Sequence, residues 1–300
     1  MPKTCSERAA PETTRVVLHG PTMGTRWSAT CELAPQIDAR ALQRDLAATV
    51  ERVDAQMSPW RSDSCLVQLN QAPVGAWFAL TTEMLQILAC ALDIGRLSQG
   101  AFDIGVGALV DAWGFGAARS APDASAIRAA RALAHGPAHE TLELDLHAGR
   151  ARKLAPLQID LCGIAKGYAV DRMAEVLQHH GVAQALAALD GELRAIGGQA
   201  DGRPWAVATS GDYRHFFDVN GQRLAHSMDA RSGTPVRGDV ASVTVLAANC
   251  MLADAWATAL LVAGAAQGLA LAQRHGLEAL WLLRRGGALV ELGLGRLGGA

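Results

Sequence analysis

Residues 159–171, which read IDLCGIAKGYAVD, constrain this chain more than any other stretch. A short apolar run passes through a glycine-containing turn and continues with apolar residues at helical spacing. This order predicts a strand, a tight turn and the start of a helix. Free backbone N–H groups and the positive end of a helix dipole collect at such a turn, and both attract phosphate. Lys166 in the first helical turn and Asp160 just before the turn are therefore candidate ligand-binding residues.

The rest of the chain predicts an α+β fold, with mixed or antiparallel sheets flanked by helices, because strands and helices alternate irregularly and several strands form hairpins. Half of the 300 residues are hydrophobic and 19% are charged, which suits a sizeable core. We expect residues 1–14 to be flexible and residues 15–300 to form a single domain. The predicted helices cover residues 38–57, 82–98, 165–181, 252–263 and 265–275. The predicted strands and hairpins cover residues 15–18, 25–31, 142–157, 185–189, 193–196, 216–226, 242–247 and 278–292. Residues 117–139 are predicted to be a helical insertion.

Composition and missing motifs exclude several classes of function. The net charge of −2 gives no basic face for nucleic acid, and apolar runs such as residues 257–263 are too short to span a membrane. The six cysteines form no CxxC pair, and the chain has no GxGxxG, Walker, HExxH or GxSxG motif. No apolar segment follows Met1, so we expect a cytoplasmic protein, or a periplasmic or membrane-anchored one if an export signal has been removed.

A second group of candidate residues lies far from this turn. Asp254 and Thr258 stand four apart on a predicted helix, so their oxygens share one face and suit magnesium. The same pair is compatible with a helix N-cap region and a core threonine. Trp60 could stack on a flat ring or pack in the core. His226, at a predicted strand end, could act as a base, orient a ligand, or serve structure alone.

Taken together, these segments resemble the ApbE family, the FAD:protein FMN transferases. The resemblance runs from about Thr22 to Gly264, and its specificity comes from seven modest motifs in the right order. The matching segments are residues 23–25, 57–70, 100–115, 159–171, 208–213, 226–235, and 242–245 with 253–258.

The resemblance implies an ApbE-like, T-fold-related enzyme that depends on Mg²⁺. Such an enzyme cleaves FAD, transfers FMN to a threonine hydroxyl of a partner flavoprotein through a phosphoester bond, and releases AMP. Carried over by motif, the expected FAD-binding residues are Met23, Trp60, Ala101, Phe102, Asp103, Asp160, Gly163 and Lys166. The expected metal ligands are the Gly163 carbonyl, Asp254 and Thr258. Asp254 and His226 are the expected catalytic residues, with His226 activating the acceptor hydroxyl or orienting the phosphate.

Two departures from the family pattern set limits on this resemblance. The family usually has two strands between a Pro-Trp pair and an Ala-Val-Ala-Thr-Ser segment. Here Pro204-Trp205 runs directly into residues 206–210, so this strand pair is expected to be missing, which bears on the sheet edge and on acceptor docking. A usual Gly-Gly pair reads Asp190-Gly191 before Glu192, so different backbone angles are expected there. The same residues also leave two other functions open: a magnesium-dependent FAD pyrophosphatase, in which water is the acceptor, and a non-catalytic FAD-binding protein.

Overall fold

The computed structural model describes residues 13–117, 121–132, 136–197, 205–212, 216–219 and 222–298. The predicted flexible segment 1–14 lies outside this range except for residues 13 and 14, and Thr14 opens the first strand. The predicted hairpin tip at Asn220 and Gly221 also lies outside it. The expected strand-pair deletion falls between Trp205 and Ala206, which are described as consecutive residues of one strand.

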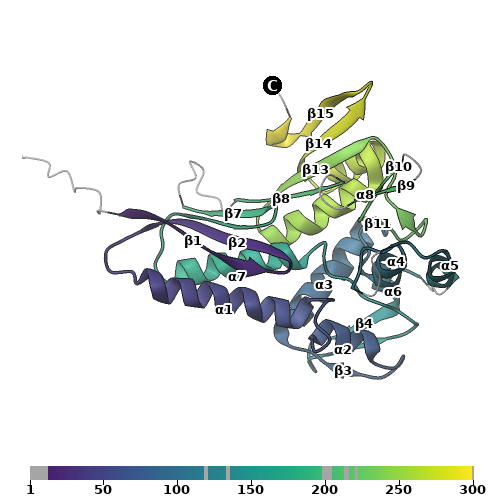
Figure 1. Ribbon diagram of the computed structural model, residues 1–300, viewed down its shortest axis with the longest axis horizontal. Helices are drawn as coiled ribbons and strands as arrows, with labels where there is room; N and C mark the ends of the chain where they lie inside the picture. The colour runs from purple at the N-terminus through teal and green to yellow at the C-terminus, as the bar shows by residue number, and fades with distance from the viewer. Residues whose placement is uncertain are drawn as a thin grey trace, which may run out of the picture.

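The largest element is an eight-stranded sheet with strand order β1-β2-β6-β7-β8-β13-β14-β15 (Figure 1). All the strand pairs formed by described residues are antiparallel, which confirms the predicted α+β class. The strands are β1 (Thr14–Thr22), β2 (Thr25–Leu33), β6 (Ala185–Leu189), β7 (Glu192–Ile196), β8 (Trp205–Gly211), β13 (Val240–Ala247), β14 (Glu278–Arg285) and β15 (Ala288–Leu294).

Three long helices pack against one face of this sheet: α1 (Ala39–Met57), α7 (Ala165–His179) and α8 (Cys250–Arg274) (Figure 1). Alternation along β2 turns Trp27 and Ala29 toward the helices. Helix α1 begins where predicted, because the Asp38 side chain accepts hydrogen bonds from the backbone N–H groups of residues 40 and 41.

Helix α8 contains a break at Gly264, where φ is 74° and ψ is 176°. The break agrees with the two separate helices predicted on either side of this glycine. By length and hydropathy α8 is the one candidate membrane span among the described helices, but 56% of its most apolar window is buried within the protein. Such burial is typical of a central core helix, and it fits the expectation of no membrane span.

A second group of elements lies beyond one end of these three helices (Figure 1). It contains a three-stranded sheet of β3 (Phe78–Ala79), β5 (Arg150–Lys153) and β4 (Leu142–Asp145). The helices here are α2 (Cys65–Gln71), α3 (Thr82–Leu97), η1 (Ile104–Val106), α4 (Gly107–Ala112), α5 (Ala124–Ala132) and α6 (Ala138–Thr141). Two hairpins, β9 (Phe216–Val219) with β10 (Gln222–Ala225) and β11 (Met228–Asp229) with β12 (Thr234–Pro235), and η2 (Gly295–Leu297) complete the described chain.

The predicted strand at the start of residues 159–171 is wrong. Ile159 is buried and extended, but it belongs to no sheet. Its N–H donates to Oδ1 of Asn70 at 2.7 Å, and Nδ2 of Asn70 donates to its carbonyl at 2.9 Å. A side chain therefore takes the place of a neighbouring strand. The turn and the helix that follow are confirmed, since α7 begins at Ala165.

Candidate active site

The two halves of the site meet where the first turn of α7 rests on α8. Gly167 makes this possible, because a Cβ at this position would lie 2.3 Å from the carbonyl oxygen of Cys250. Its N–H donates to Oδ2 of Asp254 at 3.0 Å. Asp171, also on α7, caps α8 by accepting from the N–H groups of Cys250 and Met251, each at 2.9 Å. The i, i+4 pair Asp254 and Thr258 is thus held against the turn of residues 159–171.

A small pocket of about 70 Å³ opens at this junction. From the turn it takes Cys162, Gly163 and Lys166, and from α8 it takes Asp254 and Thr258. The turn between β6 and β7 adds Asp190 and Glu192, the end of β8 adds Ser210, and His226 closes it from the segment before β11. The structure therefore brings together five of the predicted site residues: Gly163, Lys166, His226, Asp254 and Thr258.

Lys166 is held between two carboxylates. Its Nζ lies 3.1 Å from Oδ2 of Asp190 and 3.0 Å from Oε1 of Glu192. Burial acts to lower the pKa of Lys166, but the negative charges of Glu192 and Asp254 outweigh it and raise the pKa above its usual value. Lys166 is therefore a permanent cation inside an acidic pocket.

Asp254 carries a carboxyl group whose pKa is strongly raised. Burial, reinforced by the negative charge of Glu192, raises its pKa to about 7, although Lys166 and the N–H of Gly167 oppose the change. Three carboxylates and one ammonium line the same small space, which leaves an excess of negative charge when Asp254 is ionised. A bound divalent cation would offset this excess.

The predicted metal ligands fit magnesium. A Cβ on Gly163 would lie 3.2 Å from Oγ1 of Thr258, so the turn and the hydroxyl are in contact. Among the described residues, Oδ1 of Asp254 accepts no hydrogen bond, whereas Oδ2 has Gly167 as its partner. A carboxylate, a hydroxyl and a nearby carbonyl are hard oxygen donors, and Mg²⁺ commonly takes few protein ligands. The described residues contain no cluster of three His, Cys, Asp or Glu side chains suited to a metal, so the candidate donor set combines one carboxylate with a hydroxyl and a carbonyl.

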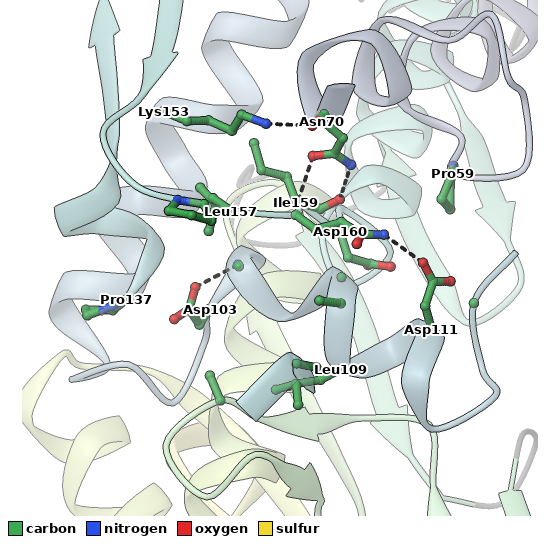
Figure 2. Close-up of a pocket in the computed structure, with 18 of the residues that line it drawn as sticks. Pro59, Asn70, Asp103, Leu109, Asp111, Pro137, Lys153, Leu157, Ile159 and Asp160 are labelled. Atoms are coloured by element: carbon green, nitrogen blue, oxygen red, sulfur yellow. Dashed lines mark hydrogen bonds between the residues drawn. The ribbon is translucent and has the colours of Figure 1, made fainter. Parts of the chain in front are cut away.

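A second, much larger pocket of about 1270 Å³ is lined in part by residues 156–160, directly before the same turn (Figure 2). Trp60, with 59% of its surface exposed, lies in its wall together with Asp103 and Asp160. Desolvation raises the pKa of Asp160, and the N–H of Cys162, which donates to Oδ1 at 2.8 Å, partly offsets this rise. Asp103 Oδ1 accepts from the N–H groups of Gly105 and Ala138, which holds η1 and α6 at the pocket wall.

Known proteins resemble this chain in sequence and in fold. The model described as "ApbE family" matches residues 23–208 and 206–281. The chain belongs to the ApbE family. An FAD:protein FMN transferase of Vibrio cholerae serotype O1 is 36% identical, over 90% of this chain and 88% of its own length. The FAD:protein FMN transferase of Escherichia coli K12 is 31% identical, over 94% of this chain and 89% of its own.

Solved ApbE structures share the fold. The flavin transferase ApbE from Vibrio cholerae superimposes with a TM-score of 0.83 at 33% identity, covering 94% of this chain and 97% of that one. The apo form of Pseudomonas stutzeri flavinyl transferase ApbE gives 0.83 at 32% identity, with 94% and 95% coverage. The family resemblance and the ApbE-like architecture predicted from the motifs are therefore confirmed. The two matched segments meet within β8, beside the predicted strand-pair deletion.

The remaining predicted ligand contacts of this ApbE-family chain differ in their setting. Ala101 and Phe102 are almost fully buried, and the Phe102 ring supports the turn, with Cε2 3.3 Å from a Cβ built on Gly163. Met23 lies in the β1–β2 turn with a φ of 44° and is not in the described lining of either pocket. Their contact with FAD stays a prediction.

Sequence reasoning missed the acidic side of the small pocket. Asp190 and Glu192 had been noted only as a departure in a turn, yet both bind Lys166. Asp190 has a φ of 61°, so it holds a left-handed backbone angle of the kind that glycine adopts easily. A polar residue in place of a turn glycine was the available signal, because only a functional or structural contact would favour such a replacement.

Proposed function

We propose that this chain is an FAD:protein FMN transferase. In this proposal it uses Mg²⁺ to pass FMN from FAD to a threonine hydroxyl of a partner flavoprotein, forming a phosphoester bond and releasing AMP. Family membership and the names of the relatives support flavin transfer. The threonine acceptor and the AMP product are what the family resemblance implies, and the oxygen donors that line the small pocket support the metal.

One observation carries the proposal: a single turn separates the two pockets. Asp160 lines the large pocket, and Cys162 and Gly163, two and three residues on, line the small one. A dinucleotide in the large pocket can therefore place its pyrophosphate at the N-terminus of α7, beside Lys166 and the proposed metal ligands. Helix N-termini and lysines favour such an anion.

The reaction requires charge neutralisation and a correctly placed hydroxyl. The acceptor threonine oxygen forms a bond to the FMN phosphorus, and the bond from that phosphorus to the bridging oxygen breaks, so that the oxygen leaves with AMP. When bound, Mg²⁺ would stabilise negative charge that develops on the phosphoryl oxygens. Gly163, Asp254 and Thr258 would hold the ion. The ammonium group of Lys166 would stabilise the same negative charge on the phosphoryl oxygens.

His226 is the residue that we assign to the threonine proton or to the orientation of the phosphate. Its ring lies in the small pocket and contacts Phe115 edge-on, with ring centroids 6.5 Å apart. A positioned general base typically contributes about 10²–10⁴-fold to the rate. The pH dependence of turnover in His226→Gln, compared with the parent chain, separates the two roles, because loss of a base removes a titration from the profile.

The deciding experiment incubates the chain with FAD, MgCl₂ and a purified flavoprotein domain that carries a candidate threonine. Acceptor mass, free AMP and free FMN are measured, with the threonine→valine acceptor as the control. A mass gain of one FMN, with AMP released in equal amount, supports the transferase. Free FMN and AMP without labelling would instead support the pyrophosphatase alternative, and bound but unchanged FAD would refute both enzymatic functions.

A further inference from the structure

The side chain of Asn70 joins the end of α2 to the segment that carries Asp160. Its carboxamide donates to the carbonyl of Ile159 at 2.9 Å and accepts from the N–H of the same residue at 2.7 Å (Figure 2). The two residues are 89 positions apart. One amide side chain therefore occupies both backbone hydrogen-bonding groups of the residue directly before Asp160, as a neighbouring strand would.

Asn70 is itself held in place. Nζ of Lys153 donates to the backbone carbonyl of Asn70 at 2.5 Å, in the last turn of α2. Lys153 is only 5% exposed, and among the described residues it forms no ion pair. A cation at the C-terminal end of a helix satisfies free carbonyls and interacts favourably with the dipole. The end of α2 is thus fixed before its side chain reaches Ile159.

The other edge of the same segment is fixed by η1 and α4. The N–H of Asp160 donates to the carbonyl of Ile104 at 2.8 Å, and the N–H of Gly107 donates to the carbonyl of Gln158 at 3.0 Å. Residues 158–160 are therefore clamped from both sides although they belong to no sheet. Of these two clamps, the one formed by Asn70 depends on a single side chain.

We propose that Asn70 is a positioning residue of the large pocket, which we call the flavin pocket because it is the proposed FAD site. In this role Asn70 fixes Asp160 relative to Trp60. Helix α2 connects the two, since Ser64 caps its start and also donates to the carbonyl of Ser58, just before Trp60. Asn70 at the end of the helix then sets the register of Asp160. Only a carboxamide both donates and accepts at this place, because a carboxylate would face the Ile159 carbonyl with no hydrogen to donate.

This inference rests on the proposed function in one respect, namely that the large pocket binds FAD. The test compares Asn70→Ala, Asn70→Asp and Asn70→Gln with Leu66→Val, a fully buried substitution on the same helix that leaves the amide clamp intact. Leu66→Val is the matched control for simple loss of stability. FAD affinity is measured by fluorescence titration without an acceptor, and melting temperature by calorimetry.

We expect Asn70→Ala and Asn70→Asp to raise the Kd for FAD by about tenfold or more, since misplacement of a positioning group by about 1 Å has large effects. The kcat at saturating FAD should fall much less. Asn70→Gln, which keeps both polar groups, should recover part of the affinity. Leu66→Val should lower the melting temperature and leave the Kd unchanged.

Hydrogen exchange separates failure of this inference from failure of the proposed function. The peptide containing Ile159 and Asp160 should exchange faster in Asn70→Ala than in Leu66→Val, whether or not the chain binds FAD. An unchanged exchange rate would overturn the clamp. An unchanged Kd in an Asn70→Ala variant that exchanges faster would overturn the positioning role, and a parent chain that does not bind FAD would overturn the flavin pocket itself.

Discussion

The backbone N–H of Gly167 donates to Oδ2 of Asp254 at 3.0 Å, and this contact joins the turn proposed to bind phosphate to the proposed metal site. The approach depends on the missing side chain, because a Cβ on Gly167 would lie 2.8 Å from Cβ of Asp254 and closer still to the Cys250 backbone. The same N–H lies in the first turn of α7, where backbone N–H groups have no helical partner. Asp254 thus satisfies the helix start while keeping Oδ1 available to a cation.

Gly167→Ala should therefore damage both stability and metal binding. The added methyl group overlaps backbone atoms, so α7 and α8 must move apart, at a cost of about 1–3 kcal/mol or more. Thermal unfolding should show a lower melting temperature and a reduced gain on addition of MgCl₂. Gly276→Ala is the stability control, because its φ of 61° makes the substitution strained while the methyl group meets no atom within 4 Å and lies in neither pocket. Equal behaviour of the two variants would contradict the assigned contact.

The pKa of Asp254 predicts how metal-free stability depends on pH. Because this pKa is raised to about 7, the folded chain binds a proton that the unfolded chain has already released. The contribution of Asp254 to the free energy of unfolding is therefore greatest at low pH. It falls as the pH rises from about 4, the ordinary pKa of an aspartate, to about 7, the raised pKa in the folded chain. Asp254→Asn should remove this slope between these limits, as measured by urea unfolding in EDTA. A slope that persists in the variant would assign it to another group.

Magnesium binding should show the opposite trend with pH, since the ion binds the ionised carboxylate and competes with the proton. The rise in melting temperature produced by MgCl₂ should be small at about pH 6 and larger at about pH 8, on either side of the Asp254 pKa. In Asp254→Asn it should be lost at both values. A magnesium effect of equal size in the variant would refute Asp254 as a ligand.

Asp190 gives a prediction that distinguishes this chain from the usual family pattern. Asp190→Asn keeps a residue that tolerates the left-handed φ of 61°, but removes one of the two carboxylates on Lys166. The ammonium then interacts more strongly with the pyrophosphate, while the metal loses nearby negative charge. We expect about two- to fivefold tighter FAD binding and a similar weakening of Mg²⁺ binding, in keeping with a partly exposed ion pair. Calorimetric titration measures both, with Asp93→Asn, an exposed carboxylate on α3, as the control.

Local patterns predicted those elements whose causes are local. Asp38 marks the start of α1, Gly264 divides α8, and the i, i+4 spacing places Asp254 and Thr258 on one face. The apolar run at Ile159 predicts a strand, because such runs are typical of strands. Its true partner is a side chain on α2, a helix that the sequence pattern had not revealed, and such a distant partner leaves no periodic signal.

Local patterns likewise predicted only part of the site. Helical spacing places Asp254 and Thr258 on one face, but their assignment as metal ligands, with Gly163, came from the family resemblance. The turn follows from its glycine and lysine. The acidic neighbours of Lys166 depend on the β6–β7 turn facing α7, which is a property of sheet order and not of spacing. Phe102 differs in another way. The family motif marks it as an FAD contact, but its buried ring packs against Gly163 and supports the turn.

Helix α5 holds the segment that carries His226 through hydrogen bonds. This contact can be tested by a substitution on α5 that leaves the site residues unchanged. Arg131 donates from Nη2 to the carbonyl of Ser232 at 2.9 Å and from Nε to that of Gly233 at 3.2 Å. Trp113 donates to Gly233 as well, at 3.3 Å. Met228, two residues after His226, packs in the small hydrophobic cluster that includes Ala130 of α5. The position of His226 therefore depends on this helix.

Arg131→Met keeps the apolar stem of the side chain and removes both donated hydrogen bonds. The freed carbonyls can bind water, so the melting temperature should change little, by the equivalent of about 1 kcal/mol or less. Turnover should fall by about tenfold with the Kd for FAD unchanged, because a loosened His226 is less often in place for the transfer step. Arg128→Met is the matched control, since Arg128 is exposed on the same helix and, among the residues that the structure describes, forms no hydrogen bond to this segment. A parallel loss of FAD affinity in Arg131→Met would show that the loop shapes the flavin pocket instead, whereas equal turnover in both arginine variants would show that α5 does not hold His226.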